Sequence, residues 1–318
     1  MKADAKHYFD MSDAFLKAAE ERGYKPVSWQ DHDLFDPYYE KMNDHWCANT
    51  SFLNLWGWKE SFPAFYKVYG DYILLLNYLR LDGYPTAAPC LGHYTNDGIK
   101  NVTEELVRDF EAFGYPLVLM DIVPWMLPYY QASGVEFELE DLRDLQDYVY
   151  TPEEFLEGME AQDDRYRYRY FKRKFNYETV ELTEDMADEC LSFMDKCWCG
   201  YTECEECCGC LKQVVYNAVE HIKELQGLGV LVRVDGEAAG LCIVTCRNHL
   251  GIYQYKNAVN SIKGLNEYLL RECFERYLTD TDMINYTEDM GVESLRYYKE
   301  HLAPHYSLLS KYTLTRKV

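Results

Sequence analysis

The stretch YQYKNAVNSIKGLNEYLL, from Tyr253 to Leu270, decides the fold of the chain. Alternating residues predict a strand over 251–258, and Gly264 then precedes an amphipathic helix predicted over 266–278. A strand, a glycine turn and a helix place free backbone N–H groups where they can hold an anion. We therefore expect a ligand site beside this turn.

The next stretch, INYTEDMGVESLRYYK from Ile284 to Lys299, is dense in ionisable groups. It predicts a strand over 283–286 and a helix over 292–302. Lys256 and Asn285 fall near the C-terminal ends of their strands, where open α/β sheets bind ligands. We predict that both take part in catalysis. Glu288 is the nearest candidate for a general base.

Arg296 and Lys299 are three residues apart, so they share one face of the predicted helix. We predict that both bind substrate or cofactor. A structural alternative stays open, because Glu288 and Asp289 precede the helix, where negative charge is favourable. In that alternative, Asp289 and Arg296 form an ion pair that fixes the corner between strand and helix.

These two stretches resemble the signature N-R-E-E-D-L-G-x-x-G-L-R-x-A-K-x-S-Y-x-P…K-Y of the phosphatidylglycerol lysyltransferase C-terminal domain family (DUF2156). The matching residues are Asn285, Glu288, Asp289, Gly291, Leu295, Arg296, Lys299, Pro304, Lys311 and Tyr312. Upstream, Lys256 matches the lysine of H-x-E-K-A, although the acidic residue is lost. Residues 147–150, DYVY, and 52–60, FLNLWGWKE, are similar to the family's D-Y-V-Y and F-T-N-L-Y-x-W-R.

The resemblance implies an α/β (α+β) fold with two GNAT-like domains in tandem, each a mixed central sheet flanked by helices. It also implies transfer of an aminoacyl or acyl group to an amine or hydroxyl. A length of 318 residues favours two domains as well. We place an N-terminal domain over 1–150 and a C-terminal domain, carrying the transfer site, over 151–318.

Periodicity predicts the other elements of both domains. The first half should contain strands over 71–79 and 116–123 and a helix over 101–113. The second half should contain helices over 181–198 and 210–226 and a last strand over 311–316. Asp235-Gly236, between two alternating runs, predicts a hairpin.

The formal net charge of −22 disfavours binding to nucleic acid or to an anionic membrane surface unless the basic residues cluster, and no DNA partner is expected. The longest apolar run, near 116–130, is broken by Asp121, Pro124 and Pro128, so stable membrane insertion is not expected. Twelve cysteines without a signal-peptide pattern predict a cytoplasmic location. The oligomeric state is left open.

The run DDRYRYRYFKRK, from Asp163 to Lys174, concentrates positive charge. In an extended segment, Arg165, Arg167 and Arg169 would share one face and the tyrosines the other. Such a strip could bind the acceptor stem of an aminoacyl-tRNA donor, and replacing the three arginines by Ala should then weaken binding. Alternatively, the arginines neutralise an acidic partner domain.

Acetyl-CoA-dependent N-acetyltransferase activity is a second hypothesis. GNAT enzymes that use acetyl-CoA carry Q/R-x-x-G-x-G/A at the helix that grips pyrophosphate. Here the window is 261–266, SIKGLN. Gly264 is kept and Lys263 could meet a phosphate, but Ser261 and Asn266 depart from the pattern. Coenzyme A binding is therefore weakened, and Gly264 can also be read as an ordinary turn residue.

Six cysteines lie within fourteen residues in CWCGYTECEECCGC, from Cys197 to Cys210. Their C-x-x-C spacing could hold zinc or an iron–sulfur cluster. Redox-active thiols or an incidental cysteine-rich loop are the alternatives, and no metal ligand is assigned. The loop supports a third hypothesis, a non-enzymatic ligand-binding module or metal or redox sensor.

Overall fold

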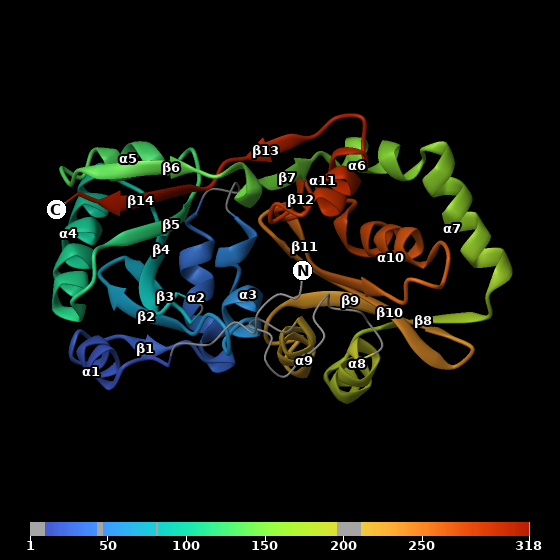
Figure 1. The fold of residues 1–318 in the computed structure, drawn as a ribbon, viewed down its shortest axis with the longest axis horizontal. Coiled ribbons are helices and arrows are strands. Elements are labelled where there is room, and N and C mark those ends of the chain that lie inside the picture. Colours follow the sequence, from blue (N-terminus) through green and yellow to red (C-terminus); the bar gives the residue numbers. More distant parts are fainter. Residues whose placement is uncertain (1–9, 43–46, 81, 196–210, 318) are drawn as a thin grey trace. The chain divides into compact units, whose positions relative to one another are not determined.

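The computed structural model describes residues 10–42, 47–80, 82–195 and 211–317 (Figure 1). The Cys197–Cys210 loop lies outside the described residues, so its three interpretations stay predictions. The chain divides into two compact units. The first contains the described residues up to Arg143 together with the last strand, and the second contains those from Asp144 to Leu309.

The first unit is built on a seven-stranded sheet with the order β1-β2-β3-β4-β5-β14-β6. Its elements are α1 (Asp13–Glu21), β1 (Lys25–Pro26), η1 (Trp29–Asp31), α2 (His32–Tyr39), η2 (Ala48–Thr50), α3 (Phe52–Gly57), β2 (Ala64–Tyr69), β3 (Tyr72–Leu79), β4 (Tyr84–Gly92), α4 (Asn96–Phe113), β5 (Val118–Ile122), α5 (Leu127–Gln131), β6 (Phe137–Asp141), η3 (Arg143–Leu145) and β14 (Tyr312–Arg316). Only β4 and β5 pair in parallel among the described strands of this sheet.

The second unit repeats this plan with the order β13-β7-β12-β11-β10-β9-β8. Its elements are β7 (Asp147–Tyr150), α6 (Pro152–Met159), α7 (Gln162–Lys174), β8 (Tyr177–Glu181), η4 (Glu184–Met186), α8 (Ala187–Met194), α9 (Leu211–Glu220), β9 (Gly227–Val234), β10 (Glu237–Arg247), β11 (Leu250–Ala258), α10 (Leu265–Cys273), the π-helical turn η6 (Phe274–Leu278), β12 (Met283–Asn285), α11 (Glu293–Glu300) and β13 (Ser307–Leu309). Here β11 and β12 form the parallel pair.

The two sheets exchange a strand. β7 follows β6 directly in the chain, yet it pairs with β12 and β13 in the second sheet. β14 follows β13, yet it pairs with β5 and β6 in the first sheet. The boundary expected after residue 150 therefore differs from the unit boundary, because periodicity predicts a strand but does not reveal its pairing partner.

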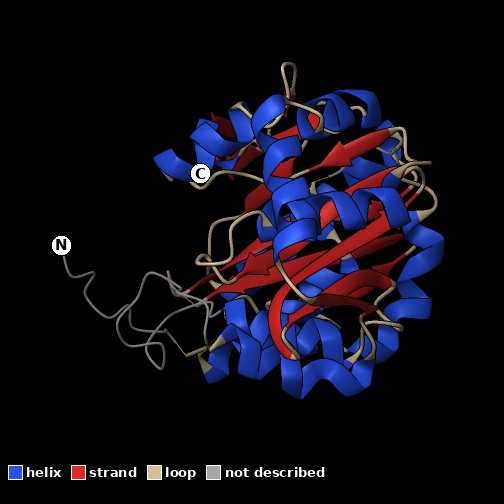
Figure 2. Cartoon of the chain, turned by 90° about the vertical axis from the view of Figure 1, so that its right-hand side faces the viewer, coloured by secondary structure: helices blue, strands red, loops and turns tan. Residues whose placement is uncertain are grey.

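The predicted α/β class, with two mixed sheets flanked by helices, is confirmed (Figure 2). The hairpin at Asp235 is also confirmed, since β9 and β10 pair on either side of it. The helix predicted over 181–198 is partly wrong, because β8 extends to Glu181 and α8 covers only Ala187–Met194. Within the described residues, no helix combines the length and apolar character that a membrane span requires.

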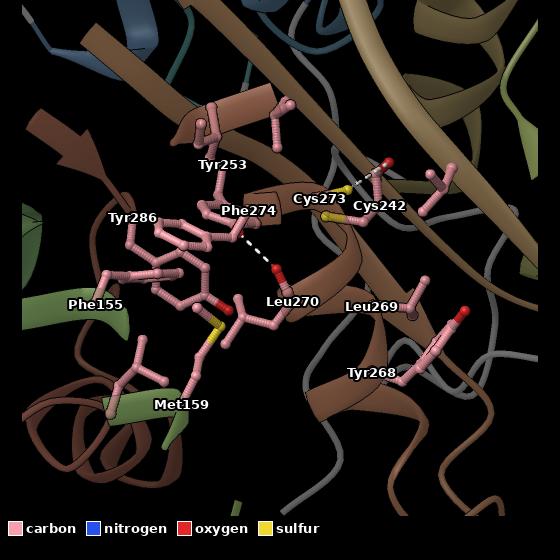
Figure 3. Packing of buried hydrophobic residues seen from close by; sticks show 14 of the residues in the cluster. Phe155, Met159, Cys242, Tyr253, Tyr268, Leu269, Leu270, Cys273, Phe274 and Tyr286 are labelled. Atoms are coloured by element: carbon pink, nitrogen blue, oxygen red, sulfur yellow. Dashed lines mark hydrogen bonds between the residues drawn. The ribbon is translucent and has the colours of Figure 1, made fainter. Parts of the chain in front are cut away.

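The core of the second unit lies between its sheet and helices α6 and α10 (Figure 3). Phe155 of α6 stacks on Tyr253 of β11, with ring centroids 5.3 Å apart. Tyr253 donates a hydrogen bond from its hydroxyl to the carbonyl of Leu270 at 2.8 Å. Aromatic rings bury large apolar areas, so this packing fixes β11 and α10, the elements that the quoted stretch predicts.

Candidate functional site

The parallel strands β11 and β12 separate soon after they pair. Their register ends with Ile252 opposite Asn285, while β11 continues to Ala258. A bulge on β11 follows at once, because Tyr253 and Tyr255 face consecutive residues of β10. Bulges re-aim side chains and are frequent next to active sites. Beyond the end of β12, Lys256 of β11 lies beside Tyr286 and Tyr298, and we call this cluster of three side chains the wedge.

Lys256 brings the wedge its positive charge. Its half-buried ammonium lies 3.2 Å from the hydroxyl of Tyr298 on α11. It also lies 5.1 Å from the ring centre of Tyr298 and 5.9 Å from that of Tyr286. Burial raises the pKa of Tyr286 well above its usual value, and the neighbouring Tyr298 adds to the shift. The wedge therefore brings together the ammonium of Lys256, the hydroxyl of Tyr298 and two aromatic rings.

Asn285 fixes the end of β12. Its buried side-chain amide donates to a carboxylate oxygen of Asp147 at 2.8 Å. Its amide oxygen accepts from the backbone N–H of Thr287, also at 2.8 Å. The side chain thus orients the loop that leaves the strand, and its predicted catalytic role stays a prediction.

Asp289 and Arg296 form the ion pair that the structural alternative described. The buried carboxylate of Asp289 accepts from Nε and a terminal nitrogen of Arg296 at 2.9 and 2.8 Å. It also accepts from the hydroxyl of Tyr148 and the N–H of Gly291. The hydrogen bonds from Arg296 hold the pKa of Asp289 well below its usual range. Arg296 reaches Asp144 as well, at 2.6 Å.

Lys299 holds the loop between β12 and α11 from inside. Its buried ammonium donates to the backbone carbonyls of Tyr286, Thr287 and Glu288 at 2.5, 3.1 and 2.8 Å. Thr287 and Met290 have φ angles of 57° and 53°, which are uncommon for residues with a side chain. The ammonium therefore stabilises a strained loop. Glu288 lies in this loop, and its role as a general base stays a prediction.

The predicted phosphate turn is covered by α7. Gly264 has a φ angle of 87°, and a Cβ atom there would lie 2.2 Å from the carbonyl oxygen of Arg167. The ammonium of Lys263 lies 5.3 Å from the ring centres of both Tyr166 and Tyr170. The backbone of α7 and its tyrosines thus occupy the approach to the start of α10.

The other two residues of the window lie on either side of this contact. Ser261 is exposed in the turn that precedes α10, and Asn266 is half-buried in the helix. Gly264, and not Asn266, is the N-cap of α10.

The expected extended strip is wrong, because residues 162–174 form the helix α7. Alternate residues of a helix point in different directions. Arg167 therefore turns toward α10 and pairs with Glu267 at 3.0 Å. Arg165 and Arg169 share the exposed outer face with Arg173, at a spacing of four residues. We call these three residues the arginine stripe.

The arginine stripe lines a surface hollow of about 680 Å³, together with Gln162, Asp163, Tyr166, Tyr168 and Lys172. Arg165 lies 4.0 Å from Glu160. Arg169 and Arg173 form no ion pair with another described residue. Like charges four residues apart destabilise a helix slightly, so the stripe is suited to an anionic partner.

Tyr286 and Tyr298 are the site residues that sequence reasoning missed. They stand where the family signature has Arg and Ala, and both face Lys256 in the wedge. The departure from the signature at these two positions was the available signal. It could not be used, because only the structure places both positions beside the same lysine.

Comparisons with known proteins agree with the resemblance. The chain matches the family described as "Phosphatidylglycerol lysyltransferase, C-terminal" over residues 39–315. No curated protein matches it. A conserved protein of unknown function from Bacteroides thetaiotaomicron has a similar structure, with a TM-score of 0.81 and 22% identity over 93% of this chain and 99% of that one.

Two further solved structures share the fold. One is the C-terminal domain (DUF2156) of a putative lysylphosphatidylglycerol synthetase from Agrobacterium fabrum, with a TM-score of 0.60 and 10% identity over 92% of this chain and 93% of that one. The other is L-PGS from Bacillus licheniformis, with a TM-score of 0.60 and 13% identity over 90% and 91%. At these identities the likeness is one of fold.

Proposed function

Because the chain belongs to the phosphatidylglycerol lysyltransferase C-terminal family, we propose that it transfers an activated aminoacyl or acyl group to an amine or hydroxyl acceptor. One observation carries the proposal. The family's lysine, Lys256, lies at the point where β11 and β12 separate, 3.2 Å from the hydroxyl of Tyr298. This pairing places a positive charge and a proton donor in one wedge.

The proposed chemistry uses both groups. The acceptor attacks the carbonyl carbon of the donor, and negative charge develops on the carbonyl oxygen. The ammonium of Lys256 stabilises that charge. As the bond to the leaving oxygen breaks, Tyr298 donates its proton to it, while Glu288 removes the proton of the acceptor. The hydrogen bonds that Lys299 donates to the loop between β12 and α11 keep Glu288 in place relative to the wedge.

For the donor, we propose an aminoacyl-tRNA. The support is the arginine stripe, because its guanidinium groups are exposed and tyrosines lie beside them on α7. Arginine binds phosphate through forked hydrogen bonds, and aromatic rings stack on unpaired bases. The cations of the last turn also stabilise the C-terminus of α7, so a role in helix stability accompanies the proposed one.

The acetyl-CoA alternative has less support from the second unit. Pyrophosphate would need the backbone around Gly264, where the carbonyl of Arg167 lies too close for even a methyl group. The ammonium of the exposed Lys263 lies beside the rings of Tyr166 and Tyr170. The residues at this turn therefore do not fit coenzyme A. A melting temperature raised by acetyl-CoA, through ligand linkage, would favour the alternative.

The sensor hypothesis concerns the loop 197–210, outside the described residues. Metal analysis of protein purified without chelators and without oxygen tests it. Stoichiometric zinc or iron would favour the sensor, and folded, metal-free protein would count against it.

The transferase proposal is tested with bulk tRNA charged with labelled amino acids, by following release or transfer of the label. We expect enzyme-dependent loss of label that falls roughly 100-fold in Lys256→Met, the cost of removing one oxyanion donor. Lys223→Met, at an exposed position of the same unit, is the matched control. Equal rates for the wild type and Lys256→Met would contradict the assigned role.

A further inference from the structure

The start of α2 in the first unit gathers one histidine and two aspartates. His32 is buried, with 7% of its surface exposed. Its Nε2 lies 3.3 Å from a carboxylate oxygen of Asp36, and its Nδ1 lies 3.6 Å from one of Asp33. One ligand atom from each residue can be chosen so that all three lie within 4.8 Å of one another.

The ring of His32 has an unsatisfied nitrogen. Nε2 is fully buried, and its 3.3 Å contact with Asp36 does not have hydrogen-bond geometry, so it has no hydrogen-bond partner among the described residues. An unsatisfied buried polar group costs about 1–3 kcal/mol, so such an atom needs an explanation. The atom faces Asp36, whose side chain keeps 26% of its surface exposed. An ion arriving from solvent can therefore reach both groups.

The surroundings hold the three side chains in place. The ring of His32 meets that of Phe52 edge-on, with centroids 5.3 Å apart. A capping box between Ser28 and Asp31 fixes the turn before α2. The carboxylate of Asp31 also accepts from the hydroxyl of Tyr66 at 3.0 Å. The approach to His32 is thus preorganised by contacts that do not use Asp33 or Asp36.

We propose that His32, Asp33 and Asp36 bind a divalent first-row metal ion in the first unit. His32 and Asp36 are four residues apart, the spacing at which two side chains on one helix face ligate a metal. One imidazole and two carboxylates suit manganese, iron or zinc. The exposed side of Asp33 leaves coordination positions for water. The ion satisfies the buried nitrogen and ties the first turn of α2 together.

The test uses the full chain, stripped with a chelator and titrated with Mn²⁺ while free Mn²⁺ is followed by electron paramagnetic resonance. Mn²⁺ is chosen because it prefers oxygen and nitrogen ligands to the cysteine thiolates. We expect one site that raises the melting temperature. Affinity should fall at least about tenfold in Asp33→Asn and Asp36→Asn. Asp97→Asn, at an exposed carboxylate in the first turn of α4, is the control.

Asp33 is fully exposed, so Asp33→Asn tests the site without disturbing the fold. Unchanged Mn²⁺ affinity in both variants would overturn the proposal. Absence of binding by the wild type would overturn it too. So would nitrogen NMR spectra in which both ring nitrogens of His32 carry protons whether or not Mn²⁺ is added, since a proton would then replace the metal.

Discussion

Replacing Lys299 by Met tests whether the loop between β12 and α11 depends on one buried ammonium. The three carbonyls that Lys299 contacts would lose a charged donor. Hydrogen bonds to charged groups contribute about 1.5–3 kcal/mol each, and several kcal/mol of ammonium desolvation offset part of the sum. We therefore expect a net loss of about 3 kcal/mol. Methionine keeps most of the side-chain volume, so this loss reflects the ammonium.

Because the chain has two units, the assay must resolve the loop itself. Native-state hydrogen exchange gives the free energy of opening for peptides that cover residues 286–291. These peptides should lose protection in Lys299→Met, since the positive φ angles of Thr287 and Met290 store strain that the loop would release. Lys223→Met is the control. A change below about 1 kcal/mol, with unchanged protection, would refute the reasoning.

Three other substitutions, one of them with a matched control, are predicted to have separable effects. Asp289→Asn should cost about 3 kcal/mol at pH 7. Because the folded-state pKa of Asp289 is depressed, its contribution to the free energy of unfolding is present above pH ~4 and is lost as the pH falls further. Urea unfolding between pH 7 and 3 should therefore show a free energy of unfolding that depends less on pH in the variant than in the wild type. Gly264→Ala should cost about 3 kcal/mol or more and expose α7 to hydrogen exchange. Gly236→Ala, with a similar φ but no atom within 4 Å, should cost about 1 kcal/mol; equal costs would contradict the close approach of Arg167. Tyr298→Phe should lower kcat about 100-fold at an unchanged melting temperature, and an unchanged kcat would remove Tyr298 from the mechanism.

The sequence predicts some local elements of the second unit. The hairpin at Asp235 and the strand and helix around Gly264 follow from alternation and turn chemistry, which act over a few residues. The pairing of Asp289 with Arg296 also follows from spacing, because only seven residues separate them along the chain. The exchange of β7 and β14 does not follow, since it depends on contacts between residues that are far apart in sequence.

The segment 163–174 shows how local alternation can mislead. Its Arg-Tyr alternation is compatible with an extended segment, yet packing of Phe171 and Tyr168 against α10 selects a helix. Tertiary packing commonly overrides local preference in this way. The same packing turns Arg167 toward Glu267 and puts Arg173 on the same helix face as Arg165 and Arg169, so the predicted set of arginines on one face changes by one residue.

Binding of a tRNA-borne donor by α7 is tested most directly by the salt dependence of tRNA binding. We predict that the logarithm of the binding constant falls linearly with the logarithm of the salt concentration. Each of Arg165→Ala, Arg169→Ala and Arg173→Ala should lower the slope by about 1. Arg167→Ala, whose guanidinium pairs with Glu267, should leave the slope nearly unchanged. Binding that is absent, or that is equal in the wild type and a triple variant of the arginine stripe, would contradict the account.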